Sequence, residues 1–295
     1  MIGPTVRFLP RRAIDAGRWD ATVDAATNGK PYGLSWWLDA TTDGNWWGLV
    51  LDDYRTVLAV PHHLRLGPFA LVNGAPFTQQ TGPFGNAPLP QPALLLTHLP
   101  RTCAVRQLDL GVVPDAALPP RFRVRQRTNL VLDLDRSYTE LFRSYRKNIK
   151  QKLRGEAGYV RPWRTEDFLA FYFRHTADRF GMPDRERNVL AALCAAVDKR
   201  GRSTVLRFTD GAGQPLGGLY LVRHGRRLVN LLATSSPAGL TADAMARLLD
   251  HVIRTHAGTD LVLDFEGSDL RGVATFFRGF GARPEPYLTL SDRWL

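Results

Sequence analysis

The chain contains few of the residues that mark several common protein classes. Its 295 residues include two cysteines and three methionines, and lysine supplies only five of the 39 basic residues. Cys103 and Cys194 lie far apart in apolar surroundings, which argues against a disulfide framework and predicts buried free thiols. No apolar run is long enough for a signal peptide or a membrane span. We therefore expect a cytoplasmic protein.

Sequence signatures for several kinds of catalysis are also absent. The seven histidines lack metal-ligand spacing: His62 and His63 point to opposite faces of a strand, and His251 and His256 do not share a helix face. The chain has no P-loop, no Gly-x-Ser-x-Gly turn and no Cys/His signature. We expect no bound metal, and catalysis without a serine or cysteine nucleophile.

Positive charge is concentrated in one part of the chain. The net charge is +11, yet residues 1–120 hold nine basic and nine acidic residues. Residues 121–164 hold 13 basic and four acidic residues, an excess of nine. Such a local belt indicates an anionic partner, although a solvated basic face is the simpler alternative.

The order of predicted elements indicates a mixed α/β fold. The first half reads as a strand at 6–9, a helix at 12–27, strands at 46–51 and 55–66, an irregular loop to 92, a helix at 93–99 and a strand at 104–110. The second half reads as a strand pair at 122–134, helices at 138–154, 165–180 and 187–199, strands at 203–209, 216–223 and 226–233, a helix at 242–256, a strand at 261–265, a small helix and a strand at 287–290. Helices and antiparallel strands in this order predict an α/β layer with a mixed sheet. Pro114 to Pro120 reads as a linker, so we expect domains at 1–120 and 121–295.

The helix expected at 138–154 is the first candidate for a binding surface. Ser137 is placed to cap it, and one face carries Arg143, Lys147, Lys150 and Arg154. Arg121, Arg123, Arg125 and Arg127 alternate along the preceding strand and extend the belt. A face of this kind suits the phosphates of tRNA, a CoA nucleotide or a phosphorylated acceptor.

The junction between the strand at 226–233 and the next helix is a second candidate. Ser235, Ser236 and Gly239 are small, so backbone N–H groups at the helix start are accessible to an anion such as pyrophosphate. Thr241 is placed to cap the helix. A plain capping loop is the alternative interpretation.

Two carboxylates near the end of the chain are candidates for proton transfer. The buried run 261–263 leads to Asp264 and Glu266, which would share one face if the strand continued. A carboxylate in a cleft can accept the proton of an attacking amine. Equally, a carboxylate at a strand end often caps a helix or pairs with an arginine.

Three segments together resemble the GNAT-fold acyltransferases, in particular the double-domain Fem-type branch. They are Asp264-Phe265-Glu266-Gly267-Ser268 with Phe276-Phe277-Arg278-Gly279-Phe280-Gly281-Ala282, the run Ser144-Tyr145-Arg146-Lys147-Asn148-Ile149-Lys150, and the motif Tyr32-x-x-Ser35-x-Trp37-Leu38. The resemblance implies two tandem GNAT-like domains. It also implies a substrate cleft beside Tyr145, Lys147 and Asn148, with Tyr145 as a further catalytic candidate.

By the same resemblance the function is transfer of an acyl or aminoacyl group to a primary amine. Family members take the group from acyl-CoA or aminoacyl-tRNA, and the acceptor is a small molecule or a peptidoglycan precursor. The Arg/Gln-x-x-Gly-x-Gly/Ala loop of GNAT proteins is replaced here by Ser235-Ser236-Pro237-x-Gly239, a departure at the acyl-CoA site. Two alternatives stay open: an aminoacyl-tRNA-dependent peptidyl transferase of the cell-wall type, and a non-catalytic binder of an anionic polymer.

Overall fold

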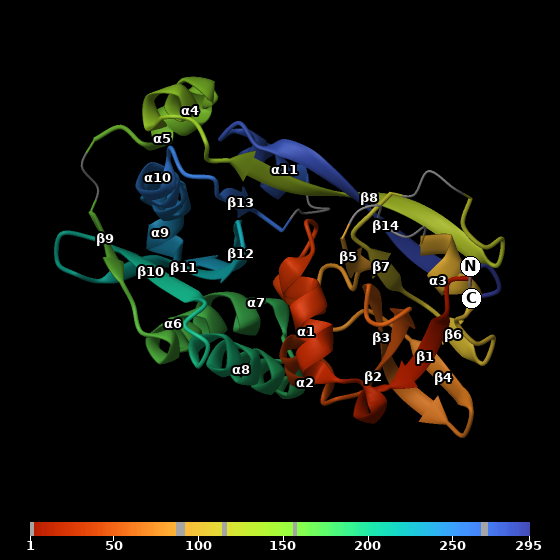
Figure 1. Ribbon diagram of the computed structural model, residues 1–295. Coiled ribbons are helices and arrows are strands. Elements are labelled where there is room, and N and C mark those ends of the chain that lie inside the picture. Colours follow the sequence, from red (N-terminus) through yellow and green to blue (C-terminus); the bar gives the residue numbers. More distant parts are fainter. Residues whose placement is uncertain (1–2, 87–91, 114–116, 156–157, 267–270) are drawn as a thin grey trace. The chain divides into compact units, whose positions relative to one another are not determined.

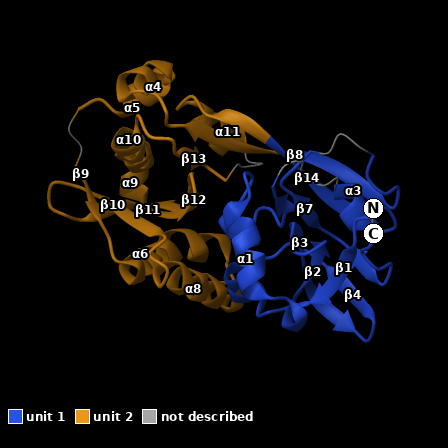
Figure 2. Ribbon diagram, in the orientation of Figure 1, with its two compact units in different colours: residues 1–127, 286–295 blue, residues 128–285 orange. Residues whose placement is uncertain are grey.

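The chain forms two compact units that divide it unevenly. The structure, a computed structural model, describes residues 3–86, 92–113, 117–155, 158–266 and 271–295. Unit 1 contains residues 1–127 and 286–295, and unit 2 contains residues 128–285 (Figure 2). Strands β8 (Phe122–Asp133) and β14 (Arg283–Asp292) each contribute residues to both units. The division into domains at residue 120 stays a prediction.

Unit 1 is built on an antiparallel meander of β1 to β4, to which β6 adds in parallel. Its sheet has the order β1-β2-β3-β4-β6, β5 pairs with β3, and β7 pairs with β14 (Figure 1). The elements are β1 (Val6–Pro10), a 3-10 turn (Arg11–Ala13), α1 (Ala16–Ala25), a second 3-10 turn (Pro31–Gly33), α2 (Ser35–Thr42), β2 (Trp46–Leu51), β3 (Thr56–Leu66), β4 (Phe69–Val72), β5 (Phe84–Gly85), α3 (Pro92–Thr97), β6 (Cys103–Val105) and β7 (Leu108–Leu110).

Apolar side chains of unit 1 pack on both sides of this sheet. Trp19 and Trp37 are fully buried, and the Trp19 indole N–H donates to the carbonyl of Gly33 at 2.7 Å. On the α3 side, a cluster that includes Trp47, Leu95 and Phe122 forms the core. The adjacent tryptophans Trp36-Trp37 and Trp46-Trp47 are therefore mainly core residues, as their apolar character predicts.

Unit 2 contains a mixed sheet with helices on both faces. The strand order is β14-β8-β13-β12-β11-β10-β9, and β12 and β13 form a parallel pair. Besides β8 and β14, the elements are α4 (Tyr138–Ser144), α5 (Lys147–Lys152), β9 (Tyr159–Pro162), α6 (Thr165–Tyr172), a π-helix η3 (Phe173–Ala177), α7 (Asp178–Phe180), α8 (Asp184–Asp198), β10 (Ser203–Thr209), β11 (Pro215–His224), β12 (Arg227–Ser235), α9 (Pro237–Thr241), α10 (Ala244–His256), β13 (Val262–Asp264) and α11 (Arg271–Arg278). The predicted mixed α/β class is confirmed.

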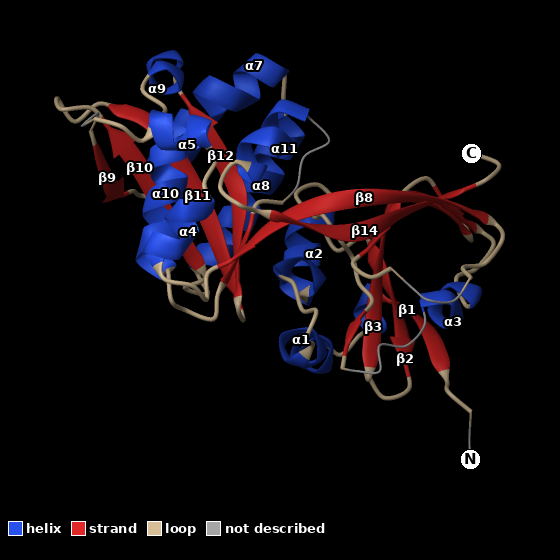
Figure 3. Ribbon diagram, turned by 90° about the horizontal axis from the view of Figure 1, so that it is seen from above, coloured by secondary structure: helices blue, strands red, loops and turns tan. Residues whose placement is uncertain are grey.

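The core of unit 2 lies between the sheet and α10. Figure 3 shows α10 beside β10 and β11, and it contacts β10, β11 and β12. Its buried face includes Leu248, Leu249, Val252 and Ile253, which recur at helical spacing. Opposite strands supply leucines to the same cluster. This amphipathic pattern is why the sequence predicts the helix well.

The long helix expected at 138–154 is wrong: the segment forms two short helices. The cap is right, because Ser137 and Glu140 form a capping box at the start of α4. Tyr145 and Arg146 then take extended backbone conformations, and the Arg146 N–H donates to the carbonyl of Gly279 at 2.8 Å. Packing against the end of α11 therefore overrides helical periodicity.

Two glycines after α11 permit this close packing. A Cβ on Gly279 would lie 2.6 Å from Ile149, and one on Gly281 would lie 2.6 Å from the Ser144 hydroxyl. Gly281 also has a φ of +89°, a conformation that glycine adopts without the strain that a side chain would cause.

Other expectations also need correction. The strand pair at 122–134 is one continuous strand, β8. The helix expected at 165–180 is α6, which ends at Tyr172 and continues as η3 and α7. The loop expected to residue 92 includes β4 and β5 among its described residues. Ser268, part of the acidic motif, lies outside the described residues. No helix in the described ranges is both long and apolar enough to cross a bilayer.

The prediction of buried free cysteines is confirmed, and it leads to a test of their reactivity. Burial raises the pKa of Cys103 to about 11 and that of Cys194 to about 12. Since the thiolate is the reactive form, both thiols should resist alkylation by iodoacetamide at pH 8 in the native protein. Mass spectrometry should show two modified cysteines in urea and none without it; rapid native modification of either would contradict the burial.

Gly239 provides a test of the fold next to the candidate junction. A Cβ at this position would lie 1.8 Å from the backbone oxygen of Leu216, so Gly239→Ala must displace backbone. We expect a loss of about 2–4 kcal/mol in the free energy of unfolding. Gly211→Ala is the control, because a Cβ added there would have no atom within 4 Å. Equal unfolding midpoints for the two variants would contradict the close approach.

Candidate functional site

Unit 2 has a break in its sheet where β12 and β13 part. Only Arg227, Leu228 and Val229 of β12 pair with β13, opposite residues 262–264. After Asp264 the chain stays beside β8, its other neighbour, where the Phe265 N–H donates to the carbonyl of Leu130 at 2.9 Å. The rest of β12 keeps its ladder with β11. Within the described residues, one edge of β12 from 230 onward therefore lacks a strand partner; we call this the β12 opening.

A β-bulge and a buried amide lie at the start of the β12 opening. The register with β11 shifts so that Leu221 faces Asn230 and Tyr220 faces Leu232, which leaves Leu231 as the extra residue. Bulges are frequent beside active sites because they redirect backbone and side chains. Asn230 is only 5% exposed, and its Oδ1 has no hydrogen-bond partner among the described residues. A buried acceptor of this kind is able to bind an N–H or O–H group of a ligand.

A π-helix covers the same part of β12. Helix α6 continues into η3, where Thr176 and Thr234 are joined through their hydroxyl oxygens at 2.7 Å. π-helical turns occur often at functional sites. One turn earlier, burial raises the pKa of Tyr172 and the nearby charge of Glu266 raises it further. The side chain of Glu266 is therefore close enough to α6 to act on Tyr172 electrostatically.

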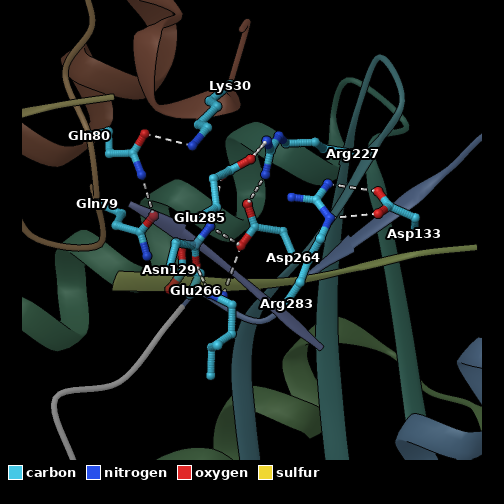
Figure 4. A network of polar contacts seen from close by, with 11 residues as sticks. Lys30, Gln79, Gln80, Asn129, Asp133, Arg227, Asp264, Glu266, Arg283 and Glu285 are labelled. Atoms are coloured by element: carbon cyan, nitrogen blue, oxygen red, sulfur yellow. Dashed lines mark hydrogen bonds and ion pairs between the residues drawn. The ribbon is translucent and has the colours of Figure 1, made fainter. Parts of the chain in front are cut away.

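Asp264 is the centre of a buried polar network (Figure 4). The side chain is fully buried, and its Oδ2 accepts from Arg227 Nη1 at 2.7 Å. Its Oδ1 accepts from Asn129 Nδ2 and from the backbone N–H of Glu266, both at 2.9 Å. Arg227 also binds Glu285. Burial disfavours the charge on Arg227, but Asp264 and Glu285 outweigh it and raise its pKa.

This network fixes the backbone of Glu266. Glu266 has a φ of +61°, a conformation that non-glycine residues rarely adopt and that costs about 1–3 kcal/mol. The hydrogen bond from its N–H to Asp264 offsets that cost. Strained residues of this kind cluster at functional sites. Asp264 thus positions Glu266, whose half-buried side chain is the better candidate for proton transfer.

The structure corrects two expectations about the catalytic candidates. Asp264 and Glu266 do not share a strand face, because β13 ends at Asp264 and Glu266 lies in a left-handed turn. Asp264 already accepts three hydrogen bonds. Tyr145 lies in the core rather than beside a cleft: it is 3% exposed, and it packs edge-to-face on Phe280 at 5.1 Å. Burial raises its pKa.

The strand-to-helix junction is mostly occupied by its own hydrogen bonds. Thr241 does not cap the helix expected at 242–256, because α10 begins after Asp243 and has no side-chain cap. Ser236 caps the short helix α9: its Oγ accepts from the N–H of Gly239 at 3.1 Å. Pro237 has no N–H, so Ala238 supplies the one first-turn N–H that could face an anion. Thr241 is exposed and bonds back to Pro237, while Ser235 is the last residue of β12.

The four basic and polar candidates lie on two helices instead of one. Arg143, Lys147 and Asn148 are exposed, and neither Arg143 nor Lys147 has a carboxylate partner among the described residues. Lys150 donates from Nζ to the carbonyl of Arg143 at 2.9 Å, which satisfies the C-terminal end of α4. The prediction that these residues share one face of a single helix is therefore wrong, but they still form an exposed basic surface. Arg121, also assigned to the belt, is paired with buried Asp292 at 2.7 Å.

Metal ligation finds no geometric support in the described ranges. No group of three or more His, Cys, Asp or Glu side chains there is arranged to hold an ion.

Comparisons with known proteins show what this part of the chain is similar to. Residues 143–278 match the family profile described as Acetyltransferase (GNAT) domain. The match covers somewhat less than half of the chain, and this part of the chain is similar to that family. The matched range contains the β12 opening, η3 and the parting of β12 from β13.

Solved structures extend the likeness to nearly the whole chain. The structure of FemX is 14% identical, with a TM-score of 0.64 over 97% of each chain. The lysylphosphatidylglycerol synthetase of Bacillus licheniformis is 13% identical, with a TM-score of 0.54 over 94% of this chain and 91% of the other. The C-terminal domain of the putative enzyme of that name from Agrobacterium fabrum is 10% identical, with the same score and coverage. The Fem-type fold expected from the sequence is confirmed; no curated protein sequence matches.

Several residues of the site were not anticipated from the sequence. They are Asn129, Arg227 and Glu285 in the network, and Asn230, Tyr172, Thr176 and Thr234 at the opening. One signal was available: Arg227 and Asn230 interrupt an otherwise apolar strand, and Asn129 begins a buried run in β8. A polar residue inside a buried strand must find a partner, which makes it a candidate for a site or a network.

The network can be tested by comparing two neighbouring ion pairs. Asp264→Asn leaves the buried Arg227 with one of its two carboxylate partners, Glu285. We expect a loss of about 3–5 kcal/mol in unfolding free energy. Asp260→Asn removes the partner of Arg226, an exposed pair at 3.2 Å, and should cost less than about 1 kcal/mol. Urea unfolding followed by circular dichroism measures both. Similar losses would show that Asp264 has no special structural role.

Proposed function

We propose that this protein is an N-acyltransferase that passes an activated acyl or aminoacyl group to a primary amine. The observation that carries the proposal is the β12 opening, where an unpaired strand edge, a buried acceptor and a strained carboxylate meet in a GNAT-like domain. The reaction needs alignment of an amine with an activated carbonyl more than it needs any one side chain.

The unpaired edge of β12 suits a donor that carries amide groups. An extended amide chain can add to a free strand edge through backbone hydrogen bonds. The pantetheine arm of CoA is such a chain, and so is the peptide-like end of an aminoacyl group. Asn230 Oδ1 can accept one N–H from the donor at the bulge. A backbone N–H of the bulge can in turn stabilise the oxygen of the tetrahedral intermediate.

In this proposal Glu266 is the general base that accepts the proton of the attacking amine. The amine nitrogen bonds to the carbonyl carbon, the thiolate or alkoxide of the donor departs, and the amine proton passes to the Glu266 carboxylate. Asp264 acts through Glu266, as a positioning residue. Lys147, Arg143 and Asn148 are proposed to contact phosphates of the donor or acceptor from the surface of α4 and α5.

Aminoacyl-tRNA is the second candidate donor. Two observations favour it: the first turn of α9 offers at most one N–H to a diphosphate, and the helices α4 and α5 expose basic side chains without carboxylate partners among the described residues. Lysylphosphatidylglycerol synthetase, a structural neighbour, is named for a lysyl group. The acceptor on this route is an amine of a peptidoglycan precursor, as the Fem-type resemblance implies. A binder without catalysis is the remaining alternative.

Glu266→Gln tests the assignment of the proton. The substitution keeps shape and hydrogen bonding but removes the base, so turnover should fall about 10²–10⁴-fold with donor affinity unchanged. Transfer from acetyl-CoA to a panel of primary amines is measured by released thiol, and transfer from aminoacyl-tRNA by loss of the charged form. Glu166→Gln, an exposed glutamate on α6, is the control. Undiminished turnover in Glu266→Gln would contradict the role of Glu266 as the base. Absence of any transfer by the native protein would favour the alternative that the protein binds an anionic polymer without catalysis.

Calorimetry separates the two donors. Acetyl-CoA and total tRNA are titrated at two salt concentrations. Affinity for tRNA should fall steeply with salt, whereas affinity for CoA should change mildly. We expect Arg143→Glu with Lys147→Glu to lower the affinity for the donor that binds through phosphates roughly ten-fold or more. Lys199→Glu, at the exposed end of α8, should leave that affinity unchanged. Equal affinities in the two variants would count against the basic surface.

A further inference from the structure

Unit 1 contains a groove that the proposed transfer does not use. Its volume is about 660 Å³, and its lining includes Arg11, Arg12, Trp47, His62, His63 and Arg65. None of the described residues that line it is an Asp or a Glu. Arg11 is paired with Asp39, but Arg12 and Arg65 are exposed and have no carboxylate partner in the described ranges. The groove is therefore suited to an anion.

The hairpin formed by β3 and β4 (Figure 1, orange) supplies Arg65, Gly67 and Pro68 to the lining of this groove. In its register, Leu66 faces Phe69 and Leu64 faces Leu71, so these four side chains share one face. Leu64, Leu66 and Phe69 are 65%, 78% and 61% exposed. Large apolar residues grouped in this way are uncommon on a protein surface unless they meet a partner.

The opposite face of the same hairpin is basic and anchored to the core. Arg65 faces Ala70, which is buried in the unit 1 core. The Arg65 guanidinium lies 6.0 Å from the ring of Trp47, and Trp47 packs on His62 at 4.1 Å. The tip of the hairpin thus combines an apolar face with cationic groups that the described part of the chain does not neutralise.

We propose that the β3–β4 hairpin and the adjoining basic groove form a docking site for an anionic phospholipid bilayer. The exposed leucines and Phe69 enter the boundary between headgroups and acyl chains, while Arg65 and Arg12 bind phosphates of the headgroups. A soluble phosphate ester would engage the groove but leave the apolar face in water. A second copy of this chain carries the same positive charges, which would repel across a shared interface.

Vesicle sedimentation of the full chain tests the proposal. The protein should bind vesicles of phosphatidylcholine mixed with phosphatidylglycerol, and bind poorly to phosphatidylcholine alone. Leu66→Ser with Phe69→Ser should lower partitioning about ten-fold or more, because two apolar anchors are lost. Arg65→Glu should lower it roughly five- to thirty-fold, since each basic group near an anionic surface contributes about a five-fold effect.

Matched controls lie in unit 2. Phe180 is 74% exposed and Arg185 is an exposed residue of α8, so Phe180→Ser and Arg185→Glu should bind vesicles like the native chain. Glu266→Gln should also bind normally, which keeps this test separate from the transfer reaction. Circular dichroism checks the fold of each variant; Arg65→Glu, which changes an exposed side chain, serves if the double serine variant does not fold.

Three results would overturn the proposal. The first is equal binding to neutral and anionic vesicles, or no binding to either. The second is binding of glycerol phosphate that depends on Arg65 while vesicles are ignored, which would indicate a soluble ligand. The third is a concentration-dependent dimer that the Leu66 and Phe69 changes abolish, without vesicle binding, which would indicate a second copy of the chain.

Discussion

The buried contact between Arg227 and Asp264 is the centre of the polar network beside the break in the unit 2 sheet. It joins the first residue of β12 to Asp264, the last residue of β13, after which the two strands part. Burying two charges is costly, and the cost is recovered only if each remaining lone pair and proton finds a partner. Asn129, Glu285 and the backbone of Glu266 supply those partners. The network therefore couples β8, β12, β13 and β14 around one carboxylate.

Asp264 and Glu266, which have the same expected role in the sequence, therefore have different roles in the folded protein. Asp264 is saturated with donors, so its contribution is positional. Glu266 is held in a left-handed conformation by Asp264, close enough to Tyr172 to act on it. Strain stored at one residue and offset by a neighbouring hydrogen bond is a common way to hold a reactive group in place. The same opening contains a bulge and a buried acceptor, so backbone and side chain can both serve a donor there.

The glycines after α11 show how tertiary contacts reshape a local pattern. The segment from Tyr138 to Arg154 has helical periodicity, and a cap at Ser137 that forms as expected. Yet Gly279 and Gly281 allow the end of α11 to approach so closely that Arg146 donates to a carbonyl of that segment instead of continuing the helix. Tyr145, which would have lain beside a cleft on a continuous helix, is buried against Phe280 as a result.

Elements with strong periodicity and clear stops could be predicted from the chain alone. The α10 helix, the strands of β10 to β12, the buried cysteines, the mixed α/β class and the Fem-type resemblance all follow from patterns within about fifteen residues, where local propensity and burial agree. Glu266 was among the candidates for the same reason. Only the folded structure distinguishes the role of Glu266 from that of Asp264. The side chains that bind Asp264, those of Arg227 and Asn129, are 37 and 135 residues away in the chain. The exposed hairpin face at Leu66 and Phe69 was likewise beyond local patterns, since an apolar strand reads as buried until its neighbours are known.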